Sequence, residues 1–318
     1  MIPIGGGAAS TRGEPPVPGG LGRPQPMREL ILSHEPAIRL VFSFGVLSVM
    51  ALWEVVAPRR PTSLGRWARW PSNLGIVVLN TVLLRVLLPT TAVALALAGE
   101  RAGWGLLHQL AVPGWLALPL AVITLDLVVY LQHVMVHAVP LLWRLHRVHH
   151  ADLHFDVTTG ARFHPIEIIL SMLIKFAAIL VIGPAPEAVV VFEVLLNATA
   201  MFNHGNVRLA EKLDRGLRLI VVTPDMHRVH HSVEQEDTNS NFGFNLPWWD
   251  RLFGTYRAQP RGGHAGMTIG IHGFRDPQQV DRLPGMLALP FLGKVTDYAI
   301  NRRQWGAGEP IADRKETP

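Results

Sequence analysis

The chain has 318 residues, of which 49% are hydrophobic and 17% are charged, and its mean hydropathy is +0.25. Soluble domains usually carry about 25% charged residues, so this composition argues against a water-soluble enzyme and favours one membrane-embedded unit. The absence of cysteine excludes disulfides, iron–sulfur clusters, thiolate zinc sites and a cysteine nucleophile. A net charge of +5 from scattered arginines argues against nucleic acid as a partner, whereas fifteen histidines beside three tyrosines are unusual.

The first 27 residues are rich in glycine and proline and contain too few apolar residues to build a core. Residues 1–27 are therefore predicted to form a disordered tail. No signal peptide is predicted, because a charged segment followed by an apolar stretch is missing near Met1.

Four apolar segments follow the tail. Three of them approach the ~20 residues that cross a bilayer as a helix, and each contains one charged residue: Leu40–Ala57 with Glu54, Leu74–Ala98 with Arg85, and Val112–Leu131 with Asp126. The fourth consists of Ile166–Ile182 and Glu187–Phe202, which a Gly-Pro-Ala-Pro sequence separates. This break predicts a helical hairpin. The predicted fold is all-α, with about four transmembrane helices, the last a hairpin; the alternative is a buried hairpin in a soluble bundle.

The distribution of basic residues predicts the orientation. Residues 58–73 contain four arginines and residues 99–111 contain one, so the positive-inside rule places the first loop in the cytoplasm. The third helix then delivers a histidine-rich helical cap to the cytoplasmic side. The arginines of the N-terminal tail would lie outside the cytoplasm in this orientation, which argues against it.

Histidines recur at metal-binding spacings. His133 and His137 are four residues apart at the end of the third span, which places them on one helical face. Asp126 lies seven residues earlier on that face, where a carboxylate can accept the outer N–H of a ligating imidazole. His204 follows the hairpin, which returns it to the same side of the membrane.

The pattern H-x-x-H-H occurs twice, at residues 146–150 and 227–231. Adjacent helical residues diverge by about 100°, so one such motif can serve two metal ions. Nine imidazoles exceed what one ion uses, which predicts two ions. Imidazole suits iron, zinc, copper and nickel, so the ligands do not select the metal. Two irons could activate dioxygen, whereas two zincs could act only as Lewis acids or form hydroxide.

Several motifs in fixed order resemble one family. They are D-x3-Y-x2-H-x3-H from Asp126, W-R-x-H-x-x-H-H from Trp143, TGARFHPIE from Thr159, N-H-x-N from Asn203, P-x-M-H-x-x-H-H-S from Pro224, N-x-G-F-N from Asn241 and W-D-R-L-F-G-T-Y from Trp249. Over roughly residues 120–260 the sequence is similar to the fatty acid hydroxylase/sterol desaturase superfamily of integral-membrane, non-haem di-iron oxidases.

The resemblance implies a di-iron centre that uses O2 and two electrons to hydroxylate or desaturate a C–H bond of a lipid (fatty acyl, sterol or terpenoid). The implied ligands are His133, His137, His146, His149, His150, His204, His227, His230 and His231. Three further residues are candidates either as ligands or as groups that orient ligands: His164, Asp126 and Asp225. No catalytic side chain beyond the ligands is expected. Glu167 and Asp250 have two open interpretations each, a role at the site or a role at a helix start.

The predicted organisation is a tail (1–27), N-terminal transmembrane helices (28–120), a di-iron catalytic domain (121–260) and a C-terminal interfacial segment with a tail (261–318). Within it, residues 208–220 are predicted to form a helix on the membrane surface. Residues 283–300 are interpreted as a packed segment or a gate for lipid entry. Tyr130, Trp143 and Trp249 are assigned either to an oxidant pocket or to packing.

The chain shows no haem-domain or nucleotide-binding motif, so a separate electron donor is predicted, a ferredoxin or a cytochrome b5-like protein meeting the basic face. The composition suggests a bacterial inner membrane, with the site facing the cytoplasm. Alternative functions are a membrane di-zinc hydrolase, a metal transporter and a haem electron carrier. The sequence does not determine the substrate, the choice between hydroxylation and desaturation, or the oligomeric state.

Overall fold

The structure is a computed structural model that describes residues 26–61 and 65–293. Every regular element in these residues is a helix, and strand-like pairing is limited to three isolated bridges. The all-α prediction is therefore confirmed. The predicted N-terminal tail lies outside the described residues except for Pro26 and Met27, which begin α1 (Pro26–Ser33).

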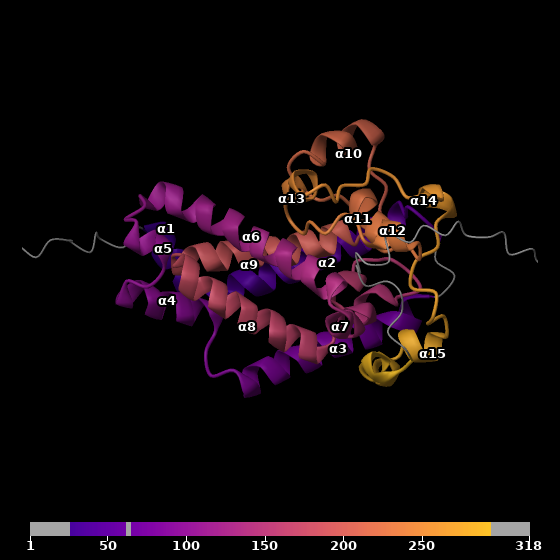
Figure 1. Cartoon of the computed structure of the whole chain (residues 1–318), viewed down its shortest axis with the longest axis horizontal. Coiled ribbons are helices and arrows are strands. Elements are labelled where there is room, and N and C mark those ends of the chain that lie inside the picture. The colour runs from indigo at the N-terminus through magenta and orange to yellow at the C-terminus, as the bar shows by residue number, and fades with distance from the viewer. Residues whose placement is uncertain (1–25, 62–64, 294–318) are drawn as a thin grey trace, which may run out of the picture.

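Long apolar helices form one end of the molecule. Four segments have the length and composition to cross a membrane: α2 (Glu35–Val56), the stretch Arg66–Gln109, α6 (Gly114–Ala138) and α8 (Pro165–Ile182). The helices α2, α6, α8 and α9 (Pro186–Asn203) run along the long axis, and α9 packs against both α2 and α6 (Figure 1). Large apolar side chains are exposed on the four segments that could cross a membrane, for example Phe42, Val78 and Leu173. Such surfaces indicate an integral membrane protein.

The predicted segment Leu74–Ala98 lies within the candidate span Arg66–Gln109, but it forms two helices, so the prediction of one continuous helix is wrong. α3 (Arg66–Leu87) ends before Pro89, because a proline disfavours helical geometry in the residue that precedes it. α4 (Ala92–Ala102) then begins at its own cap, where Thr91 Oγ1 accepts a hydrogen bond from the backbone N–H of Ala94 at 3.1 Å. α4 packs against α8 and α9, and α5 (Leu106–Gln109) follows it at the same end of the molecule (Figure 1).

The predicted hairpin is confirmed as α8 and α9. Gly183 ends α8 in the left-handed conformation, with φ of +67°, and its N–H donates to the carbonyl of Ile179 at 2.9 Å. A Cβ at Gly183 would lie 2.5 Å from the carbonyl oxygen of Trp104, so glycine is required there. Because the hairpin reverses the chain, the start of α8 and the end of α9 reach the same end of the molecule.

Short helices form the end of the molecule at which α8 begins and α9 ends. They are α7 (Pro140–His150), η1 (Thr159–Ala161), α10 (Glu211–Leu217), α11 (Pro224–His230), α12 (Gln235–Thr238), α13 (Trp248–Leu252), α14 (Gly263–Gly266), α15 (Pro277–Val280), α16 (Leu283–Ala288) and η2 (Leu289–Phe291). α10 is shorter than the predicted helix at 208–220 and contains no buried residue. Met286 and Leu289 pack with Ile76 and Trp143 in one core cluster, which supports the packing interpretation of this segment. Residues 294–300 lie outside the described residues.

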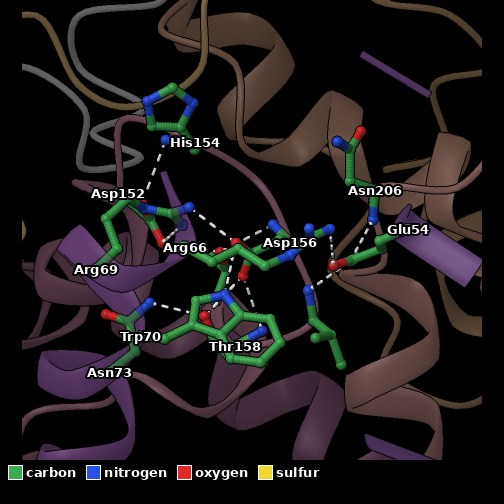
Figure 2. Close-up of polar contacts among 12 residues, drawn as sticks. Glu54, Arg66, Arg69, Trp70, Asn73, Asp152, His154, Asp156, Thr158 and Asn206 are labelled. Atoms are coloured by element: carbon green, nitrogen blue, oxygen red, sulfur yellow. Dashed lines mark hydrogen bonds and ion pairs between the residues drawn. The ribbon is translucent and has the colours of Figure 1, made fainter. Parts of the chain in front are cut away.

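A buried ion network fixes α3 to the loop that follows α7 (Figure 2). Arg69 donates from Nε and Nη2 to Asp152 at 2.9 and 2.7 Å, and from Nη1 to Asp156 at 2.8 Å. Arg162 lies 3.2 Å from Asp152 on the other side. All four side chains are almost completely buried. Since buried charges are tolerated only when they are paired, this network fixes the loop that begins directly after His150.

Replacing Arg69 by methionine is expected to lower the free energy of unfolding by about 3–5 kcal/mol, because two carboxylates stay buried with too few partners. The measurement is urea unfolding in detergent micelles, followed by tryptophan fluorescence. Arg215→Met is the control, since Arg215 is exposed and pairs with exposed Glu211, and a change of about 0.5 kcal/mol or less is expected. Equal losses in both variants would contradict the role of the network.

Candidate metal centre

The nine predicted histidines converge into two groups. The first histidine group comprises His133, His137, His146, His150 and His230, and the second comprises His149, His204, His227 and His231. Within each group the possible ligand atoms all lie within 4.8 Å of one another. Every ring is buried, and even the most exposed residue, His133, is only 6% exposed. The two groups contain every residue of the predicted ligand set and no other histidine.

The motif H-x-x-H-H divides its histidines between the groups as its geometry predicts. His149 and His150 are neighbours in α7, yet their rings are inclined at 88° and belong to different groups. His230 and His231, at the end of α11, are inclined at 81° and are divided in the same way. Each motif therefore contributes to both groups.

Backbone carbonyls fix the protons of three rings. His133 Nδ1 lies 2.8 Å from the carbonyl oxygen of Phe242, and His204 Nδ1 lies 2.7 Å from that of Ala200. His230 Nδ1 lies 2.7 Å from the carbonyl oxygen of Ser240. A carbonyl oxygen only accepts, so each Nδ1 must carry a proton, and in the neutral ring Nε2 keeps a lone pair. This is the tautomer in which a histidine binds a metal through Nε2.

These Nε2 atoms face one another. The Nε2 atoms of His133 and His230 are 2.9 Å apart, and Nε2 of His204 is 3.1 Å from Nε2 of both His149 and His227. In the pair His133 and His230, whose outer protons are both held, two lone pairs at this distance repel unless a cation lies near both. Nitrogen ligands bind ions such as zinc at about 2.0–2.1 Å, so two ligands at a right angle lie about 3 Å apart. The donor set therefore fits a bound metal ion.

A shared proton is a poor substitute for a metal ion at this site. Burial lowers the pKa of His204 to about 4 and the pKa of His230 to about 3, so both rings stay neutral near pH 7. His231 has no hydrogen-bond partner for either ring nitrogen among the described residues, and Nε2 of His146 has none either. Unpartnered buried nitrogens are costly, and a metal ion would satisfy them.

Glu167 contacts the first histidine group. Its Oε1 accepts a hydrogen bond from Nδ1 of His146 at 2.6 Å, and both side chains are buried. Glu167 also lies in the first turn of α8, where a carboxylate is favourable. Both open interpretations of this residue therefore hold, and the carboxylate orients a histidine of the site.

Asp126 does not orient a histidine, so that prediction is wrong. It accepts hydrogen bonds from the backbone N–H groups of Asn245 and Leu246 at 3.3 and 3.2 Å and from Trp249 Nε1 at 2.9 Å. The heptad spacing does place it on the face of His133, but two helical turns away, about 10 Å along the axis. Its partner is the segment that follows Phe242, whose carbonyl takes the outer N–H of His133.

Two further residues position histidines of the site. The role of Asp250 was left open by the sequence, and Asn239 was not predicted. Asp250 accepts the N–H groups of Phe242 and Gly243 at 2.8 and 2.9 Å and thereby positions the carbonyl that binds His133. Burial raises the pKa of Asp250 to about 6. Asn239 Oδ1 accepts a hydrogen bond from Nδ1 of His137 at 3.2 Å. Asn239 was missed because a lone asparagine in a loop has no periodic signal.

The other candidates lie outside both groups. Asp225 pairs with Arg59 at 3.1 Å and with Arg228. His164 caps α8, where its Nδ1 accepts the N–H of Ile166 at 3.3 Å, and its Nε2 lies 3.3 Å from the carbonyl oxygen of Leu287. The structure therefore brings neither residue to a position beside the nine histidines.

The three predicted aromatic residues occupy packing positions. Trp143 lies against the rings of His137 and His150, with centroids 4.8 and 5.2 Å away. Tyr130 stacks on Phe253, and its hydroxyl lies 2.9 Å from Thr255 Oγ1. Trp249 donates to Asp126, as described above. Trp143 alone of the three touches the histidine groups directly.

Comparison with known proteins agrees with this geometry. The fatty acid hydroxylase family matches residues 118–255, a stretch that includes all nine histidines. The predicted family resemblance is confirmed. The ornithine lipid hydroxylase OlsE of Rhizobium tropici is 32% identical over 175 residues, which cover 55% of this chain and 50% of that protein.

Animal relatives of the fatty acid hydroxylase region are more distant. The alkylglycerol monooxygenase of Homo sapiens is 28% identical over 159 residues, 48% of this chain and 34% of that protein. The Xenopus tropicalis enzyme of the same name is 28% identical over 188 residues, 57% of this chain and 41% of that protein. The matched region thus spans half or less of each relative's own length. No solved structure matches the chain.

Replacing Glu167 by glutamine is expected to weaken metal binding about 10- to 100-fold, because the amide is a weaker acceptor for the N–H of His146. Competition with a metal chelator, followed by elemental analysis, measures the affinity. Glu187→Gln is the matched control, since Glu187 lies in the first turn of α9 and pairs with Arg28 away from the histidines. Unchanged affinity in the Glu167 variant would refute its orienting role.

Proposed function

We propose that the chain is an integral-membrane lipid oxygenase with a di-iron centre. It would use O2 and two electrons to hydroxylate a lipid C–H bond, or to desaturate it. The main supporting observation is the pair of buried histidine groups with facing Nε2 atoms, of which those of His133 and His230 are both unprotonated, within the region that matches the fatty acid hydroxylase family. The names of its relatives, a lipid hydroxylase and alkylglycerol monooxygenases, support this chemistry.

The first histidine group would hold one iron and the second group the other. Bound iron would supply the reduction of O2 that hydroxylation needs: the lipid C–H, O2, two electrons and two protons give an alcohol and water. Iron is proposed over zinc because zinc has no redox chemistry and would restrict the site to hydrolysis. The histidine donors alone are compatible with either metal.

The chain's own residues would orient the ligands and exclude water. The carbonyls of Phe242, Ala200 and Ser240 hold the outer protons of three rings, and Glu167 and Asn239 hold two more. This support fixes the Nε2 atoms of these five rings toward the centre of their groups before any ion binds. Burial of all nine rings keeps bulk water away from the reacting lipid.

The long apolar helices would bring a lipid chain from the bilayer to the histidine groups. Because the chain shows no motif for a redox cofactor of its own, a ferredoxin or a cytochrome b5-like protein would supply electrons. The arginine-rich loop between the first two predicted spans supports a cytoplasmic site, and we propose the bacterial inner membrane as its location.

Iron loading should give about two irons per chain. Loss of one histidine from a group should remove the iron that this group holds. His137→Ala, in the first group, and His227→Ala, in the second, are each expected to retain about one iron. The measurement is elemental analysis of the detergent-purified protein, with His34→Ala as a control outside both groups. Two zincs that resist replacement would favour the di-zinc hydrolase, and no bound metal would refute the centre.

Oxygen labelling tests the reaction class. The protein is reconstituted with bacterial polar lipids, ferredoxin, ferredoxin reductase and NADPH under 18O2, and the lipids are analysed by mass spectrometry. A lipid product that carries one 18O atom, or that has lost two hydrogens, is expected. The double variant His149→Ala/His150→Ala, which removes one ligand from each group, should form neither. In a parallel reaction in H2 18O, label that enters the product only from water would indicate hydrolysis instead.

A further inference from the structure

A cavity of about 300 Å³ lies beside the second histidine group and plays no part in the proposed reaction. It is formed by Arg60, by the loop after α7 with His154 and Phe155, by Asn206, by residues 266–269 and by Arg275. α14, which contributes Gly266, lies at the opposite end of the molecule from α4 and α5 (Figure 1). The volume of the cavity is at the lower end of the range for small-molecule sites.

The lining of this cavity is cationic. Arg60 and Arg275 line it, and no aspartate or glutamate does so among the described residues. Nη1 of Arg60 is buried without a hydrogen-bond partner in the described part of the chain. Burial and the neighbouring charge of Arg59 lower the pKa of Arg60. Arg275 Nη1 donates to the carbonyl of Ile269 at 2.6 Å, which fixes its guanidinium.

Nearby carboxylates are already committed to other arginines. Asp152 is bound by Arg69 and Arg162, and Asp225 by Arg59 and Arg228. A counter-ion for the cavity would therefore come from outside the described chain.

The cavity shares a wall with the second histidine group. Phe155 lines the cavity, and its ring centroid lies 5.5 Å from that of His204 and 5.0 Å from that of His231. Asn206, two residues after His204, holds the backbone of Arg60 in both directions. Its Oδ1 accepts the N–H of Arg60 at 3.0 Å, and its Nδ2 donates to the carbonyl of Arg60 at 2.8 Å. Figure 2 shows Asn206 and His154 beside the buried network that holds this loop.

We propose that this cavity binds a small oxyanion, inorganic phosphate or a phosphate monoester, on the outer side of the second histidine group. A guanidinium presents a planar fork of N–H donors that matches phosphate oxygens. An occupant would bridge the Arg60 segment to the segment that ends at Arg275 and would neutralise the charge beside His204 and His231. The phosphate could belong to a soluble compound or to a lipid headgroup.

Thermal unfolding of the metal-loaded, full-length protein in detergent tests the site with inorganic phosphate as the probe. Millimolar phosphate is expected to raise the unfolding midpoint by about 5 °C over chloride at equal ionic strength, since a ligand bound only by the folded state stabilises it. In the variant Arg60→Gln/Arg275→Gln, about tenfold more phosphate or higher should be needed for the same rise. Arg215→Gln, which removes an exposed arginine elsewhere, should behave like the wild type.

A second arm identifies the source of the phosphate. The same proteins are reconstituted in phosphatidylcholine vesicles with and without phosphatidic acid. Protection by phosphatidic acid alone, lost in the double variant, would assign a lipid headgroup, and protection by free phosphate would assign a soluble compound. Equal protection of wild type and double variant, or no protection in either arm, would overturn the proposal. The substitutions leave the main-chain bonds of Arg60 to Asn206 intact, and unchanged metal content would verify correct folding.

Discussion

Unprotonated imidazole nitrogens that face one another in a buried site are the constraint on which this structure depends. Backbone carbonyls hold the protons of His133 and His230 on the outer side of each ring, so their inner nitrogens meet as lone pairs 2.9 Å apart. Burial opposes the protonation that would relieve the repulsion. Such an arrangement is favourable only with a cation between the rings. In the second histidine group the outer proton of His204 is held in the same way, and its Nε2 faces those of His149 and His227.

The surrounding elements place and hold these rings. The hairpin α8–α9 brings Glu167 and His204 to one end of the molecule from opposite ends of its sequence. Asp250 fixes the carbonyl of Phe242, which in turn fixes His133. The network around Arg69 fixes the loop after His150. The buried charges of this end therefore serve orientation, while the helices at the other end expose large apolar side chains.

The sequence predicted the histidine groups because their information is local. Spacings of three and four residues specify a helical face, and adjacent histidines specify two faces, without knowledge of the tertiary fold. The Gly-Pro-Ala-Pro break predicted the hairpin for the same reason. The remainder of the site depends on contacts between distant segments: Asn239 meets His137 across 102 residues. Asp126 failed as a prediction because a shared helical face does not show which partner lies nearer. The break at Pro89-Thr90-Thr91 was missed because the apolar residues on both sides of it favoured one continuous helix.

The proposed function combines a candidate metal centre with helices that can cross a membrane. Lipid hydroxylation requires an oxidant close to the bilayer but shielded from water, and the chain combines long apolar helices with a histidine site that is almost completely buried. The relatives of its central region have lipid hydroxylase and monooxygenase names, which agrees with that combination.

The most direct test of the central claim, that imidazoles hold the metal, is X-ray absorption spectroscopy of the iron-loaded protein at the iron edge. We expect a nitrogen-dominated inner shell with the multiple-scattering pattern of imidazole rings. A shell of oxygen atoms without that pattern would place the iron on carboxylates or water instead, and would contradict the assignment of the two histidine groups as the metal centre.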